Sequence, residues 1–137
     1  MAVSSKIQIL VVEDDMEMRK TLKDLLRKMG FKNIVDRNCG AEGINIITEN
    51  IGTDEAFDLI FLNHNLPDMT GVEFKTKVEG IDGVKAPEYI LTLGTPEPAI
   101  IKQAISSGLK QIIVKPYSQQ NIVEKMINLF DKKKAAS

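Results

Sequence analysis

Residues 58–71 read DLIFLNHNLPDMTG, a short apolar run that passes into a polar loop and ends in glycine. The run at 58–62 does not alternate apolar with polar residues, as a strand with one solvated face would. It predicts a strand that is buried on both faces, which is typical of a parallel sheet with helices on either side. Pro67 and Gly71 mark the stretch after it as a loop.

The same rhythm continues in both directions from this strand. Apolar runs predict four more strands, and apolar residues at helical spacing predict helices between them. The predicted strands are 7–12, 33–37, 58–62, 88–92 and 111–115, and the predicted helices are 15–29, 41–49, 72–79, 98–107 and 118–130. Five strands that alternate with five helices predict an α/β fold, a flavodoxin-like doubly wound parallel sheet with strand order 2-1-3-4-5.

The composition fits one small globular domain. The chain has 137 residues, of which 43% are apolar, with 18 Lys and Arg against 19 Asp and Glu. This near-balance argues against a nucleic acid or a membrane surface as partner, and no apolar run approaches the ~20 residues of a membrane-spanning helix. The single Cys39 excludes a disulfide within the chain, so we expect a cytoplasmic protein. We predict one domain at 6–131, between a flexible N-terminus at 1–5 and a flexible basic tail at 132–137.

In such a sheet, the functional site lies beyond the carboxyl ends of the strands. The residues at those ends are polar: Glu13, Asp14, Asp15, Asn63, His64, Asn65, Thr92 and Lys115. Each has an ordinary explanation when taken alone, since acids favour the start of a helix and most lysines are solvated. A zinc site at His64 is disfavoured because the chain has no second histidine. Taken together, these residues predict a polar pocket at one rim of the sheet.

Four segments carry a family resemblance: ILVVEDD at 9–15, DLIFLNHNLPDMTG at 58–71, LT at 91–92 and VKPY at 114–117. In this order, and over about residues 6–130, the chain resembles the receiver domain of two-component response regulators. The resemblance implies a signalling module that a sensor histidine kinase or a phosphotransfer protein phosphorylates on an aspartate at the end of the third strand. It also implies a Mg²⁺ ion held by acids after the first strand, by that aspartate and by a backbone carbonyl two residues further on.

Carried over to this sequence, the resemblance assigns a role to the polar residues of the rim. Glu13 and Asp14 match the acid pair, with Asp14 as the direct metal ligand, and Asn65 would offer its backbone carbonyl. Thr92 matches the hydroxyl that bonds the phosphoryl oxygen on activation. Lys115 matches the lysine that pairs with the phosphate, and its bond to the following proline matches a cis peptide of the family.

The phosphoacceptor position holds Asn63 instead of aspartate. A carboxamide oxygen is neutral and does not attack phosphorus as a carboxylate does, so we predict that Asn63 forms no acyl phosphate. One carboxylate fewer also predicts weaker Mg²⁺ binding by the set Glu13, Asp14, Asn63 and Asn65. Without the metal, the acids lose a like-charged neighbour, which relieves repulsion on the order of 1 kcal/mol per close pair.

Two further positions depart from the family and bear on its switch. Ile112 stands where the family usually has an aromatic residue that rotates on activation, and Leu93 follows Thr92, where a small residue is usual. These departures predict an altered coupling between Thr92 and the face formed by the fourth helix and the fifth strand. Asn63 itself has two origins that the sequence leaves open, an engineered substitution or a natural receiver without an acceptor.

The leading interpretation is a stand-alone receiver that binds a downstream protein target and is not an enzyme. We expect the contact face at 100–108 and on the last helix. Two alternatives share the sheet. A small Mg²⁺-dependent phosphatase or phosphotransfer enzyme, similar to the haloacid dehalogenases, is disfavoured because Glu13 replaces the first aspartate of their Asp-x-Asp motif. A flavin mononucleotide binder is disfavoured because acids stand where donors to the phosphate would be needed.

Overall fold

A five-stranded parallel sheet forms the centre of the molecule. The computed structural model describes residues 3–131, and its strands lie in the order β2-β1-β3-β4-β5. The strands are β1 (Ile9–Val12), β2 (Ile34–Arg37), β3 (Leu59–Asn63), β4 (Glu88–Leu93) and β5 (Ile112–Val114), and the helices are α1 (Met16–Lys28), α2 (Gly40–Glu49), α3 (Gly71–Glu79), α4 (Pro98–Ser106) and α5 (Gln119–Phe130). The predicted fold class, strand order and five helices are confirmed.

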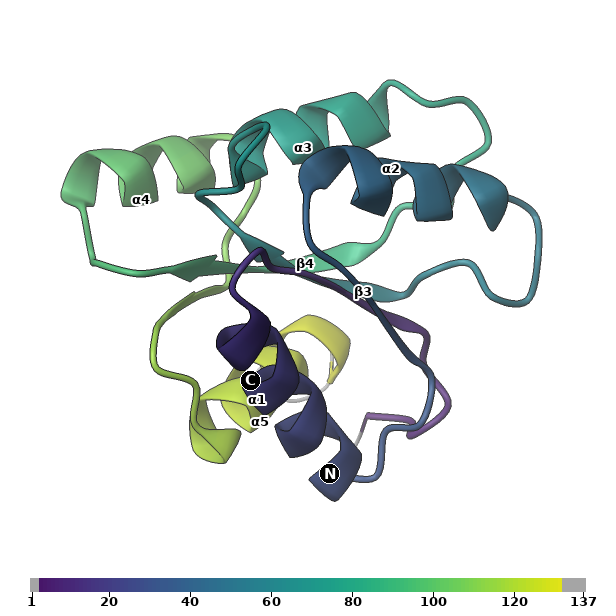
Figure 1. Cartoon of the computed structure of the whole chain (residues 1–137), viewed down its shortest axis with the longest axis horizontal. Helices are drawn as coiled ribbons and strands as arrows, with labels where there is room; N and C mark the ends of the chain where they lie inside the picture. The colour runs from purple at the N-terminus through teal and green to yellow at the C-terminus, as the bar shows by residue number, and fades with distance from the viewer. Residues whose placement is uncertain (1–2, 132–137) are drawn as a thin grey trace.

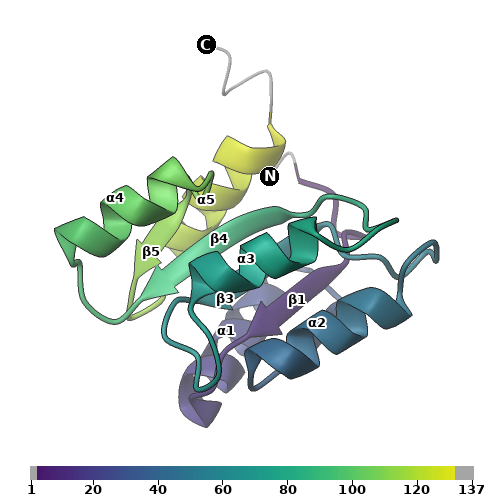
Figure 2. The ribbon, with the colours of Figure 1, turned by 90° about the horizontal axis from the view of Figure 1, so that it is seen from above.

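The helices cover both faces of the sheet. Helices α2, α3 and α4 lie on one face, and α1 and α5 lie on the other (Figure 1). Seen from above, α2, α3 and α4 lie next to one another across the strands (Figure 2). This arrangement explains the apolar runs in the sequence, because every residue of β1 and of β3 is buried.

Alternate residues of each strand enter two separate hydrophobic cores. Leu10 of β1 belongs to the core under α2, α3 and α4, whereas its neighbours Ile9 and Val11 belong to the core under α1 and α5. The reason is the two-residue repeat of a strand, which sends successive side chains to opposite faces. Helix α1 closes the second core with Leu22 and Leu26, both fully buried.

Most element bounds agree with the predicted ones to within one or two residues. Strand β3 extends to Asn63, because Asn63 pairs with Thr92 of the neighbouring β4. On α4 the apolar spacing predicts that Ile101, Ala104 and Ile105 share one helix face, but only Ala104 of these is buried and Ile105 is 51% exposed. The apolar arc of this helix is therefore wider than the surface that it covers.

The described chain begins at Val3, within the segment 1–5 that the sequence predicts as a flexible N-terminus. Val3 is 8% exposed and packs into the core under α1 and α5. The predicted tail at 132–137 lies outside the described residues. Within residues 3–131, no helix combines the length and the apolar character that crossing a bilayer requires.

Asp68, in the loop between β3 and α3, caps a helix that is distant in the sequence. Its carboxylate accepts hydrogen bonds from the backbone N–H groups of Gly40 and Ala41, both at 2.8 Å. Cys39, the N-cap residue of α2, provides no such side-chain bond. Desolvation is the largest single influence and opposes the ionisation of Asp68, but these two N–H groups, the backbone N–H of Asp68 itself and the charge of Lys77 together hold the pKa of Asp68 below its usual value. These bonds tie the loop after β3 to the start of α2.

We expect Asp68→Ala to lower the free energy of unfolding by about 1 kcal/mol near neutral pH, as for loss of a helix cap. Because the pKa of Asp68 is lower in the folded chain than its unfolded value of 3.8, this stabilisation is present above that value and is lost as the pH falls through the folded pKa. Urea unfolding of both proteins, at neutral pH and at about pH 3, measures the difference. A difference that stays constant with pH would contradict a role for the carboxylate charge.

Candidate functional site

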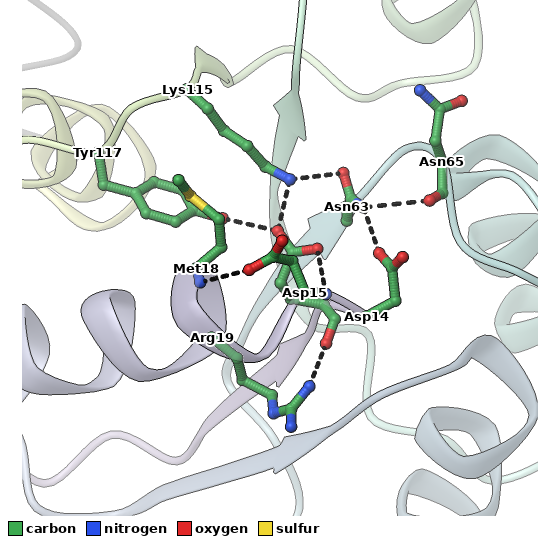
Figure 3. Close-up of polar contacts among 9 residues, drawn as sticks. Asp14, Asp15, Met18, Arg19, Asn63, Asn65, Lys115 and Tyr117 are labelled. Carbon is green, nitrogen blue, oxygen red and sulfur yellow. Dashed lines mark hydrogen bonds and ion pairs between the residues drawn. The ribbon is translucent and has the colours of Figure 1, made fainter.

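The carboxyl ends of the strands bring the predicted site residues together at one edge of the sheet. Asn63 ends β3 beside Thr92 of β4, Glu13 and Asp14 directly follow β1, and Lys115 directly follows β5. Glu13, Asn63 and Thr92 are all buried. Figure 3 shows Asp14, Asn63 and Lys115 pointing toward one another. The bond from Lys115 to Pro116 is cis, as the resemblance implied.

Asn63 lies at the centre of this pocket (Figure 3). Its amide nitrogen donates to Asp14 Oδ1 at 2.9 Å and to the Asn65 carbonyl at 3.1 Å, and its Oδ1 accepts from Lys115 Nζ at 3.2 Å. This orientation of the amide matches donors with acceptors on both sides. The predicted role of Asn63 as a metal ligand stays a prediction, and it would need the Asn63 oxygen on the side of Asp14. Its nitrogen faces that side, because Lys115 takes the oxygen.

Glu13 holds Lys115 in place. The Glu13 carboxylate pairs with Lys115 Nζ at 2.5 Å, accepts from the Tyr117 hydroxyl at 3.2 Å, and accepts from the backbone N–H of Asp15 at 3.3 Å. Its side chain is 2% exposed. A carboxylate buried to this degree is tolerated only when partners compensate for the lost hydration.

Tyr117 belongs to this pocket, although its place in the sequence predicts no role for it. The ring is 9% exposed, and its hydroxyl donates to Glu13. Burial is the main cause that raises the pKa of Tyr117 above its usual value. The nearby Thr92 hydroxyl lowers it, and the Glu13 carboxylate raises it further. The phenol is therefore a permanent donor at physiological pH. The available signal was its position two residues after Lys115, close to the end of β5.

Thr92 reaches the pocket, where its hydroxyl lies close enough to Tyr117 to affect that phenol without a hydrogen bond of normal geometry. Thr92 Oγ1 is buried and finds no hydrogen-bond partner among residues 3–131. The following residue, Leu93, is 2% exposed and belongs to the core under α2, α3 and α4, and Ile112 packs against that core. The two departures from the family pattern thus lie in or against the packed interior beside Thr92.

The residues present do not fit a Mg²⁺ ion in this arrangement. Mg²⁺ requires oxygen ligands in near-octahedral geometry. Asp14 and the Asn65 carbonyl do converge on one point, but the N–H groups of Asn63 occupy it as donors to both. In the described part of the chain, no three His, Cys, Asp or Glu side chains are placed to hold a metal ion. Of the predicted ligands, Asp14 and Asn65 meet around the amide nitrogen of Asn63. Glu13 instead contacts Lys115, Tyr117 and the backbone of Asp15.

His64 is buried beside the pocket. It is 4% exposed, and its Nδ1 has no partner among residues 3–131. Its backbone N–H donates to the Thr92 carbonyl at 3.0 Å, which fixes the residue to β4. Burial is the main cause that lowers the pKa of His64, while the Glu97 carboxylate raises it. A proton on His64 is therefore disfavoured in the folded state.

We expect the melting temperature to fall as the pH is lowered from about 7.5 to about 5.5. The unfolded chain takes up the proton first, because its histidine pKa of 6.5 is higher than the folded one. The stabilisation by neutral His64 is complete above the unfolded pKa and is lost on acidification. His64→Phe removes the only histidine of the chain and should flatten this dependence in thermal melts. An equal slope in both proteins would rule out His64 as the cause.

Relatives with a similar sequence come from bacterial chemotaxis. A probable chemotaxis protein CheY of Rhizobium etli is 29% identical over 126 residues, which cover 92% of this chain and 91% of the relative. A chemotaxis protein CheY of Pseudomonas aeruginosa is 26% identical over 126 residues, covering 92% and 98%.

Solved structures have the same fold. The chemotaxis protein CheY4 of Vibrio cholerae superposes with a TM-score of 0.79 at 20% identity, over 91% of this chain and 99% of that one. The receiver domain of the histidine kinase CKI1 from Arabidopsis thaliana, solved with Mg²⁺ and BeF₃⁻, gives a TM-score of 0.70 at 25% identity over 90% of each chain. The family described as response regulator receiver domain matches residues 9–127. Because that match spans most of the sequence, the chain belongs to the response regulator receiver domain family.

Proposed function

We propose that this receiver signals through contacts with other proteins and is not phosphorylated at position 63. The observation that carries the proposal is the identity of the residue at the end of β3. Asn63 lies beside Asp14 and Lys115, with Thr92 on the neighbouring strand. This is the place that the family gives to its acceptor aspartate. A neutral carboxamide in that place provides no anionic oxygen to attack phosphorus, so we expect no phosphotransfer chemistry from this chain.

The proposed partners are proteins of a two-component pathway. A sensor histidine kinase or a phosphotransfer protein would dock beside the pocket, and a downstream protein target would read the domain. Two structural relatives support this choice. One is a CheY of Borrelia burgdorferi in a CheX–CheY–BeF₃⁻–Mg²⁺ complex, and the other is the receiver domain of the histidine kinase CKI1. The near-balanced charge of the chain gives no support to a nucleic-acid partner.

A surface formed by α4, β5 and α5 is the proposed contact face for the downstream target. Ile105 of α4 is 51% exposed and Val114 of β5 is 36% exposed, two of the three large apolar side chains that are exposed among residues 3–131. A shallow groove on α5, lined in part by Val123 and Ile127, lies on the last helix. Large apolar side chains left in solvent are a common feature of protein contact sites.

The test is the response to beryllofluoride, which forms a phosphoryl-like adduct on a carboxylate oxygen. In the presence of Mg²⁺ and BeF₃⁻, the backbone amide resonances of the native chain should stay unchanged. The Asn63→Asp variant should show shifts around Thr92 and Lys115. Shifts of the same pattern in the native chain would contradict the proposal, because they would require an adduct without the carboxylate.

A further inference from the structure

We infer that the amide nitrogen of Asn63 takes the place of the divalent cation in this pocket. Protein donors then occupy the oxygens that would bind the metal. As a result, this chain binds Mg²⁺ more weakly than a chain with a carboxylate at position 63. The inference rests on the proposed function in one respect, that Asn63 stands at the acceptor position.

Four oxygens of the pocket already have a donor from the protein: Asp14 Oδ1, both carboxylate oxygens of Glu13 and the Asn65 carbonyl. Asp14 Oδ1 and the Asn65 carbonyl both accept from Asn63 Nδ2, at 2.9 and 3.1 Å. Glu13 Oε1 accepts from Lys115 and Tyr117, and Glu13 Oε2 accepts from the backbone of Asp15. A cation that bound among these oxygens would have to displace donors that hold them already.

The amide cannot simply turn over to offer its oxygen to a metal. A flip about the terminal bond would point Nδ2 at Lys115 Nζ, which is a donor without acceptor capacity. Lys115 cannot retreat easily, because its ion pair with the buried Glu13 holds it at 2.5 Å and its side chain is only 15% exposed. Lys115, on the side of Asn63 away from Asp14, thus fixes the orientation of the Asn63 amide.

Charge alone does not explain exclusion of the metal. Glu13 and Asp14 carry two negative charges against one positive charge on Lys115, so the pocket still attracts a cation. What opposes the metal in this structure is the donor between Asp14 and the Asn65 carbonyl. Metal affinity should therefore rise when the amide is removed without any change of charge, which a simple count of carboxylates does not predict.

The experiment compares Mn²⁺ binding to the native chain, Asn63→Ala and Asn63→Asp, followed by the loss of the free-ion electron paramagnetic resonance signal. Asn63→Ala has the same charge as the native chain but lacks the donor, and it should bind Mn²⁺ at least about tenfold more tightly. Asn63→Asp should bind more tightly still. Asp14→Ala combined with Asn63→Ala should abolish the gain, which places the ion at Asp14.

Two variants keep the outcome decisive. Asn63→Ser retains a small polar side chain that cannot reach both acceptors, so it should also bind Mn²⁺ more tightly than the native chain. It replaces Asn63→Ala in the comparison if circular dichroism shows that Asn63→Ala folds poorly. Equal or weaker Mn²⁺ binding in both variants would overturn the inference, because Asn63 would then be neutral or an oxygen ligand. That result would leave the proposed lack of phosphorylation intact. A BeF₃⁻ adduct on the native chain would instead overturn the proposed function, whatever the Mn²⁺ affinities are.

Discussion

We expect Asn63→Asp to become phosphorylated when it is incubated with acetyl phosphate and Mg²⁺, and the native chain to remain fully unphosphorylated. The carboxylate at position 63 would attack phosphorus and release acetate, whereas the carboxamide provides no anionic nucleophile. Lys115 Nζ already lies 3.2 Å from the Asn63 oxygen, so it is placed to neutralise charge on the new acyl phosphate. Intact-mass spectrometry, with hydroxylamine to cleave an acyl phosphate, measures the label.

Two controls make this result specific. Asn63→Ala should remain unlabelled, which excludes phosphorylation elsewhere on the chain. The native sample must first be shown by peptide mass to be free of deamidation at Asn63, because deamidation would create the aspartate. Hydroxylamine-sensitive label on such a sample would contradict the assignment of Asn63 as a position without acceptor chemistry.

Lys115→Met should lower the free energy of unfolding by about 3 kcal/mol, because it leaves the Glu13 carboxylate buried without its cation. The Glu13 side chain is 2% exposed, and its remaining donors are the neutral Tyr117 hydroxyl and one backbone N–H. The substitution also removes the donor to Asn63 Oδ1. Urea unfolding in buffer that contains a chelator measures the change without interference from metal ions.

A control at a second lysine and a double variant test whether the unpaired Glu13 charge causes the loss of stability. Lys85 pairs with Asp58, but the Lys85 side chain is 58% exposed, so Lys85→Met should change stability by less than about 1 kcal/mol. Adding Glu13→Gln to Lys115→Met removes the unpaired charge and should recover a large part of the loss. A double variant no more stable than Lys115→Met would indicate lost packing as the cause, not an uncompensated charge.

The hydrophobic pattern was sufficient to predict the sheet. Strands such as β3 are continuous apolar runs because both faces are covered, and this pattern is local in the sequence. The ends of the strands depend on neighbours across the sheet, which the pattern does not contain. Asn63 was placed just after its strand, but it is the last residue of β3 because its neighbour across the sheet is Thr92 of β4. The helical repeat puts Ile105 on one face of α4 with Ala104, yet Ile105 is exposed and Ala104 is buried, because a repeat alone does not say how wide a surface the neighbours of a helix cover.

The candidate site was predictable as a set of residues but not as a set of contacts. Asp14, Asn63, Thr92 and Lys115 follow or end parallel strands, and the carboxyl ends of such strands share one edge. Which atom of Asn63 faces Asp14 depends on the position of Lys115 on another strand, 52 residues away in the sequence. Tyr117 was missed for the same reason, since its partner Glu13 is 104 residues away.

The sequence by itself determined the order and type of the elements, and the chemical fact that a carboxamide stands at the end of β3. Both follow from properties of single residues and their spacing along the chain. The tertiary structure alone decided that the Asn63 nitrogen faces Asp14 and the Asn65 carbonyl. It also decided that Glu13 pairs with Lys115 and accepts a hydrogen bond from Tyr117. The physical reason is that hydrogen bonds select donors and acceptors within about 3 Å, and only the register of the folded sheet brings these side chains that close.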